Sequence, residues 1–178
     1  MKSYIALFRG INVGGKNVLP MKALKALLEN LDLQNVKSYI QSGNVVFQSH
    51  EENASWLSSK ISAEIEKSHG FKPQVLLLDI EEMENAIRSN PFPEAESDPK
   101  TLHLNFLAAA PETPDLQALK SFKKENERFE LKGNVFYLHA PDGIGRSKLA
   151  ANAERLLGVA MTGRNWRTVS KIMAIAKE

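Results

Sequence analysis

Tyr4-Ile-Ala-Leu-Phe8 and the segment that follows it, Gly10-Ile-Asn-Val-Gly-Gly-Lys-Asn17, begin the fold with a buried strand and a glycine-rich loop. Glycine allows backbone conformations in which N–H groups turn outward and surround an anion. The spacing is close to the phosphate-loop pattern G-x-x-x-x-G-K-[ST], but Asn17 stands where that pattern needs Ser or Thr. The segment therefore predicts an anion-binding loop, and the alternative is a tight turn that binds nothing.

The residues after this loop alternate between helical and strand patterns. Leucines recur at helical spacing after Pro20, which suits a first helical turn, and Asn53 and Gly70 suit the start and the end of a second helix. Short β-rich runs lie between the helices and after them. The expected elements are a strand at 3–9, a helix at 20–31, strands at 36–40 and 45–48, a helix at 53–69 and a strand at 73–78. The order β-α-β-β-α-β is that of the ferredoxin-like unit.

The second half of the chain nearly repeats this order. After a short helix from Asp79 to Arg88 and an acidic surface loop or linker to Lys100, the expected elements are a strand at 101–109, a helix at 113–124, strands at 128–131 and 134–138, and helices at 147–157 and 166–176. The hairpins share the related stretches Gly43-Asn-Val-Val-Phe47 and Gly133-Asn-Val-Phe-Tyr137. We therefore expect an α+β fold of two ferredoxin-like halves, residues 1–80 and 81–178, related by internal duplication.

The composition indicates an ordinary globular protein. Of 178 residues, 43% are hydrophobic and 25% are charged, and no apolar run is long enough to span a membrane. The N-terminus lacks the apolar stretch of a signal peptide, so we expect a cytoplasmic protein. The chain has no cysteine, which excludes disulfides, thiol catalysis and cysteine metal sites. No pattern indicates a metal site or a cofactor, and the oligomeric state is left open.

The net charge of +2 conceals two segments of opposite sign. Residues 79–100 hold seven acidic side chains against two basic ones, a balance of −5. Residues 139–178 hold seven basic side chains against three acidic ones, a balance of +4. A basic surface of this kind favours phosphate or nucleic acid, and the alternative is a solvated helical face.

Three sets of residues together resemble the DUF1697 family of bacterial proteins. They are Arg9-Gly-Ile-Asn-Val-Gly-Gly-Lys-Asn17, Tyr39-Ile-Gln-Ser-Gly-Asn-Val-Val-Phe47, and the pair Pro141-Asp-Gly-Ile-Gly-Arg-Ser-Lys-Leu149 with Thr162-Gly-Arg-Asn-Trp-Arg-Thr168. The resemblance covers essentially the whole chain and implies a two-part ferredoxin-like fold. It implies no established biochemical function and supplies no catalytic residues.

The first candidate site is the glycine-rich loop. A nucleoside triphosphatase is not expected here, because Pro20 delays the helix. In addition, Asp79, which ends an apolar strand as a metal-holding aspartate would, should lie at the opposite edge of the sheet from the loop. An anion site with cations at its rim remains. Its residues are Arg9, Gly10, Asn12, Gly14, Gly15, Lys16 and Asn17.

Two further candidate sites lie in the basic C-terminal part. One of them is the start of a helix at Arg146, Ser147 and Lys148, where Ser147 is a natural N-cap. Cations are unfavourable at this end of a helix, so they indicate a ligand or, as the alternative, salt bridges to Asp142 or Glu154. The third candidate segment holds two arginines that can make bidentate contacts to phosphate or carboxylate, and a tryptophan ring that could stack on a base. The tryptophan could equally be a core anchor, and the asparagine before it could be a helix cap. The residues of this segment are Arg164, Asn165, Trp166 and Arg167.

Three functions are compatible with these residues. The first is a binding protein for a phosphorylated ligand or nucleic acid. The second is an enzyme acting on a small anionic substrate, with arginine and lysine side chains as electrostatic clamps. The third is an interaction or assembly protein in which all these motifs are structural.

Overall fold

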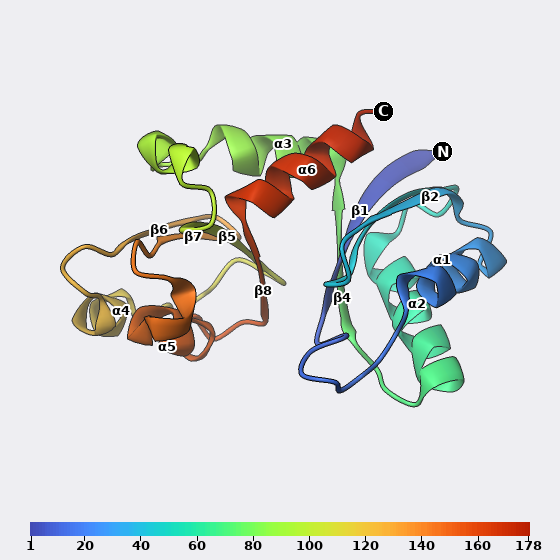
Figure 1. The fold of residues 1–178 in the computed structure, drawn as a ribbon, viewed down its shortest axis with the longest axis horizontal. Helices are drawn as coiled ribbons and strands as arrows, with labels where there is room; N and C mark the ends of the chain where they lie inside the picture. Colours follow the sequence, from blue (N-terminus) through green and yellow to red (C-terminus); the bar gives the residue numbers. More distant parts are fainter. The chain divides into compact units, whose positions relative to one another are not determined.

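A computed structural model describes residues 1–178 and shows a chain of two compact units. The first unit comprises Met1–Asn85 together with Lys171–Glu178, and the second comprises Ala86–Ser170. Each unit holds one four-stranded antiparallel sheet, and Figure 1 shows a pair of helices packed on each sheet. The fold is therefore α+β, as expected.

The sheet of the first unit has the order β2-β3-β1-β4, and every neighbouring pair is antiparallel. Tyr4, Ala6 and Phe8 alternate on the face of β1 that meets the helices, so the apolar run at the start of the chain supplies the centre of this core. The elements are β1 (Lys2–Arg9), α1 (Met21–Asn30), β2 (Gln34–Tyr39), β3 (Asn44–Ser49), α2 (Ala54–His69), β4 (Gln74–Asp79) and most of α3 (Ile80–Arg88).

The helix ends of the first unit follow the expected capping residues. The Asn53 side chain accepts a hydrogen bond from the Trp56 backbone N–H at 3.0 Å, and Gly70 ends α2 in the left-handed conformation with φ 79°. At the start of α3, Asp79 and Glu82 form a capping box, in which each side chain accepts the other's backbone N–H at 2.8 Å.

The second sheet has the order β6-β7-β5-β8, which is the order of the first sheet with each strand number raised by four. Helices α4 and α5 cover one face of it, around Leu119, Phe136, Leu138 and Leu149. The elements are the 3-10 helix η1 (Pro93–Ser97), β5 (Leu102–Leu107), α4 (Leu116–Phe122), β6 (Arg128–Lys132), β7 (Val135–His139), the 3-10 helix η2 (Ile144–Arg146), α5 (Lys148–Leu157), β8 (Met161–Asn165) and the start of α6 (Trp166–Ala176).

The strand β8 is the one strand that the sequence did not predict. Met161-Thr-Gly-Arg-Asn165 lacks the β-branched alternation of a typical strand, and it has a glycine at its centre. The structure explains that glycine, because a Cβ at Gly163 would lie 2.4 Å from the Asn105 side-chain oxygen. Asn105 on the neighbouring strand is buried and donates to the Phe136 carbonyl at 3.0 Å, so its side chain takes the space beside the glycine.

The boundaries of the units fall within α3 and within α6, whereas the sequence analysis divided the chain at residues 80 and 81. The end of α6 groups with the first unit because Lys177 contacts Glu84 at 2.8 Å and Glu178 contacts Lys37 at 2.8 Å. The acidic stretch before β5 also differs from a plain loop. It forms η1, with Phe92 and Ala95 buried against the second unit's own residues.

Candidate functional site

The glycine-rich segment forms a small hairpin rather than an open phosphate cradle. The Asn12 N–H donates to the Asn17 carbonyl at 3.0 Å, and the Lys16 N–H donates to the Val13 carbonyl at 3.0 Å. Gly14 and Gly15 form the turn with φ 58° and 74°, the two positive values that a type I′ hairpin requires. Two of the N–H groups expected to face an anion are therefore used inside the hairpin.

The side chain of Asn12 holds this hairpin in place. Its oxygen accepts the Leu19 N–H at 2.7 Å, and its nitrogen donates to the carbonyls of Leu19 at 2.8 Å and Gln41 at 2.9 Å. Asn17 likewise donates from its side chain to the Gly10 carbonyl at 2.8 Å. Both asparagines, which the sequence analysis assigned to ligand binding, thus bond to the backbone of their own unit.

The turn between β2 and β3 packs against the base of the hairpin. The Phe8 N–H donates to the Gly43 carbonyl at 2.9 Å, and Gly43 itself has φ 81°. A Cβ at Gly43 would lie 2.6 Å from the Cβ of Phe8 and 2.8 Å from Ile11, so only glycine allows this approach. The hairpin and the β2–β3 turn are thus in contact with each other through β1.

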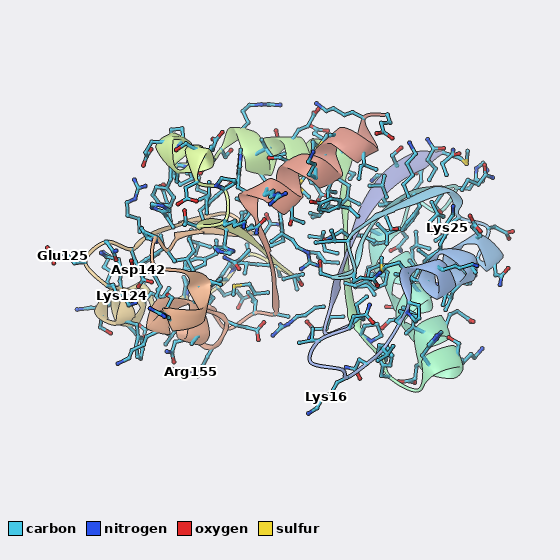
Figure 2. The ribbon with its side chains drawn as sticks, viewed as in Figure 1. Lys16, Lys25, Lys124, Glu125, Asp142 and Arg155 are labelled. Carbon is cyan, nitrogen blue, oxygen red and sulfur yellow. The ribbon has the colours of Figure 1, made fainter.

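Lys16 and Arg9 are the cations of the hairpin. Figure 2 shows the Lys16 side chain extending away from the loop, and Arg9 lies at the end of β1, 3.4 Å from the Gln74 side-chain oxygen. Asp79 lies at the other end of the same sheet, because it pairs with Tyr4 whereas Gln74 pairs with Arg9. The expected separation of Asp79 from the loop is confirmed.

The second candidate segment begins α5 in the predicted way. Ser147 is buried, and its hydroxyl oxygen accepts the Ala150 N–H at 3.0 Å. Arg146 and Lys148 are exposed on either side of this cap, and neither forms an ion pair. Asp142, which Figure 2 labels near Lys124, accepts instead from the Asn126 side chain at 3.1 Å. The two cations therefore face solvent at the end of a helix that disfavours positive charge.

The third candidate segment is partly structural. Arg164 lies in β8 opposite Leu104, half-buried, and its guanidinium donates to the Gly163 carbonyl at 2.8 Å. Burial lowers the pKa of Arg164 to about 10. Asn165 caps α6 by accepting the Thr168 N–H at 2.9 Å, which is the alternative foreseen for it. Trp166 is half-buried and Arg167 is exposed.

The two arginine-containing segments leave the second sheet at the same end. Strand β7 ends at His139, which pairs with Leu102, and β8 ends at Asn165, which pairs with His103. Both strand ends thus lie beside the start of β5. The glycine-rich hairpin belongs to the first unit, and the residues around Ser147 and Asn165 belong to the second.

A cluster around Arg128 was missed by the sequence analysis. The guanidinium lies 4.5 Å from the centre of the Phe92 ring, forms an ion pair with Glu94, and lies 3.0 Å from His139 Nδ1. The signal was available in the sequence, since a two-residue turn after Lys132 places Arg128 opposite His139. The cluster attaches η1 to the second sheet.

Burial shifts the ionisation of several groups in the second unit. It lowers the pKa of His103, whose Nε2 is buried with no hydrogen-bond partner, although a backbone contact at Lys100 acts in the opposite direction. Burial and then Arg128 lower the pKa of His139. Burial also raises the pKa of Tyr137 to about 12, and its hydroxyl donates to the Ala86 carbonyl at 2.6 Å. These groups stay neutral near pH 7 and serve packing.

The side chains offer no ready metal centre. No three His, Asp or Glu residues are grouped so that they could hold one ion. None of the helices has the length and apolar character needed to cross a membrane. The second candidate segment presents exposed cations beside the N–H groups at the start of α5.

Comparison with known proteins agrees with the resemblance noted from the motifs. The chain is similar to the structure of the conserved bacterial protein SP0830 from Streptococcus pneumoniae, with 28% sequence identity and a TM-score of 0.74 over 100% of this chain and 99% of that one. No curated protein matches the sequence. The family described as "Protein of unknown function (DUF1697)" matches residues 1–137, which include the glycine-rich hairpin and the two related stretches at 43–47 and 133–137. The chain therefore belongs to the DUF1697 family.

Proposed function

We propose that this chain is a binding protein for a phosphorylated ligand or nucleic acid, and that Arg146 and Lys148 make its main contact with phosphate. The observation that carries this proposal is the placement of two exposed cations, without ion pairs, at the N-terminus of α5. The helix dipole disfavours cations there, whereas the same N–H groups favour an anion. A bound phosphate would reconcile the helix end with both charges.

The first unit provides an internal control for this argument. Helix α2 occupies the place of α5 in the repeated order, and the residues before it are Glu51, Glu52 and its cap Asn53. Acidic residues near a helix start are favourable, so the fold itself does not require cations at this position. The basic residues of the second unit are thus better explained by a ligand than by stability.

Arg167 is exposed in the first turn of α6 and gives the second unit a further cation that a polymer could use. Trp166, half-buried at the start of α6, is the one ring of the candidate segments that could stack on a base. We further propose that both units are ferredoxin-like and arose by duplication, which the matching strand orders support. The bacterial source of the similar structure supports a bacterial protein, and the cytoplasm stays the expected location.

The test is binding of fluorescent single-stranded RNA and DNA by anisotropy across a salt series, with nucleotides and inorganic phosphate added as competitors. Replacing Arg146 and Lys148 by alanine should lower affinity at least tenfold and reduce the salt slope by about 2, since each lost phosphate contact removes about one. The matched control is Lys120→Ala with Arg155→Ala, which removes the same charge from the last turns of α4 and α5. No binding at low salt, or an equal loss in the control, would refute the proposal.

The two alternatives predict other results in the same measurements. An enzyme for a small anionic substrate should bind nucleotides or phosphate with little dependence on polymer length. An interaction or assembly protein should show no binding, while the alanine variants change melting temperature.

A further inference from the structure

Three large aliphatic side chains are exposed near the glycine-rich hairpin. Val13 is 65% exposed, Val18 is 58% exposed and Ile40 is 51% exposed, all above the other exposed aliphatic side chains except that of Met1. Single exposed apolar residues are common on protein surfaces and need no explanation. Three such residues at one end of the first sheet do need an explanation, because apolar patches on a surface mark interaction sites.

The hydrogen bonds of Asn12 bring together the backbone segments that carry the three side chains. Val13 follows Asn12 directly, and Val18 precedes Leu19, whose N–H and carbonyl both bond to the Asn12 side chain. Ile40 precedes Gln41, whose carbonyl accepts from the same side chain at 2.9 Å. Each aliphatic residue is thus adjacent in sequence to an Asn12 partner or to Asn12 itself. We call Val13, Val18 and Ile40 the hairpin patch.

Ile40 is held in a backbone conformation that is unfavourable for it. Its φ is 50°, in the left-handed region where a β-branched residue is a true outlier. Glycine or asparagine would fit this position better, and burial does not explain an isoleucine whose side chain is half exposed. Strain of this kind concentrates at functional sites, where a side chain is kept for what it contacts.

The charge around the hairpin patch has one sign. The end of the first sheet that carries the patch is formed by residues 9–20, 39–44 and 70–75, because Arg9 pairs with Gln74 and Tyr39 pairs with Asn44. These segments contain Arg9, Lys16 and Lys72 and no acidic residue. A partner that covers the patch must therefore complement positive charge as well as apolar surface.

We propose that the hairpin patch docks an acidic, amphipathic segment of a partner protein. Aliphatic side chains give such a segment an apolar contact, and Lys16 and Lys72 face its carboxylates. Nucleic acid is a poorer occupant, because valine and isoleucine do not provide the flat rings on which bases stack. The inference goes beyond the phosphate site, since it concerns apolar side chains of the other unit.

The test uses two synthetic peptides on the ¹⁵N-labelled full chain: one in which glutamates alternate with leucine and phenylalanine, and one with serine in place of every apolar residue. The first should shift backbone amide resonances of residues 11–19 and 39–43, and the second should not. Val13→Ser should weaken binding at least tenfold. Leu116→Ser, which removes an exposed apolar side chain of the second unit, should leave it unchanged.

Ile40→Gly separates docking from folding. It removes the side chain and the unfavourable φ together, so the melting temperature should stay constant or rise by about 2–4 °C while peptide binding is lost. Several outcomes would overturn the proposal: no binding of the apolar peptide, equal binding of both peptides, or displacement of the peptide by single-stranded DNA. A second copy of the chain as occupant would also overturn it, and would appear as a dimer that Val13→Ser dissociates.

Discussion

The connections that follow the first strand of each unit differ in almost every chemical property. In the first unit, residues 10–20 form a glycine-rich hairpin with Lys16 at its tip and no acidic residue. In the second unit, residues 108–115 contain Pro111, Pro114, Glu112 and Asp115 and no cation, and Asp115 caps α4 by accepting the Ala118 N–H at 3.0 Å. Equal topology has thus been combined with opposite charge.

The connections before the second helix show the reverse arrangement. The first unit has Glu51 and Glu52 there, whereas the second has Asp142 and Arg146, and its helix α5 then begins with Lys148. The basic segment is therefore in the first connection of one unit and in the second connection of the other. The strand order alone imposes neither choice.

The largest difference should come from the glycines of the two related hairpin stretches. Gly43→Ala adds a methyl group 2.6 Å from Phe8 Cβ at φ 81° and should cost about 3 kcal/mol or more. Gly133→Ala, at φ 57° with no atom within 4 Å of the new Cβ, should cost about 1–2 kcal/mol. Urea denaturation of both variants measures the difference. Equal losses would show that the β2–β3 turn is not closely packed on Phe8.

The next largest effect concerns what holds each first connection. Asn12→Ala removes three hydrogen bonds to Leu19 and Gln41 and leaves alanine at φ 54°, so we expect a loss of about 2–3 kcal/mol. Asp115→Ala removes only a helix cap and should cost about 1 kcal/mol. Chemical denaturation compares the two, and hydrogen exchange should show that residues 11–19 open first in the Asn12 variant.

Most of the fold could be predicted from local patterns, and the failures have physical causes. Asn53, Gly70, Ser147 and Gly158 mark helix ends through their own chemistry, so those boundaries were correct. Strand β8 was missed because Gly163 is explained by Asn105, a residue far away in sequence.

The candidate sites illustrate the same limit. A glycine-rich loop with two asparagines suggested ligand contacts, but the partner of Asn12 includes the Gln41 carbonyl, which only the folded chain brings near. The cations at Arg146 and Lys148 were correctly assigned to a helix start, because both the cap and the charges lie within three consecutive residues. Local sequence can identify a charged helix end, but not which loop side chains bond to distant backbone.

A smaller effect tests the reversed charges before the second helices. Ser147→Ala removes the cap of α5 and should cost about 1 kcal/mol. Lys148→Glu should instead stabilise the chain by about 0.3–1 kcal/mol at low salt, because it replaces a cation by an acid in the first turn of α5. The same substitution should abolish phosphate-dependent binding. A destabilised Lys148→Glu variant would mean that the lysine serves the fold rather than a ligand.

The smallest expected effect is a pH dependence that arises in the second unit. The folded state lowers the pKa of His103 and of His139, in both cases through burial first, so the unfolded chain takes up these protons earlier as pH falls. The contribution of the two neutral histidines to the free energy of unfolding is therefore complete above the ordinary histidine pKa of 6.5. It is lost as pH falls through 6.5 toward the lower pKa values of the folded state.

Denaturation at pH 7.5 and at pH 5.5 should show the wild-type chain less stable at the lower pH. His139→Asn should reduce this difference, because it removes a group that Arg128 and burial keep neutral while Glu94 and Asp98 act in the opposite direction. His103→Asn should reduce it as well, and the double variant most. If the double variant keeps the whole difference in stability between the two pH values, the pH dependence originates outside these two histidines. The stability of the second unit would then be no more sensitive to protonation than that of the first.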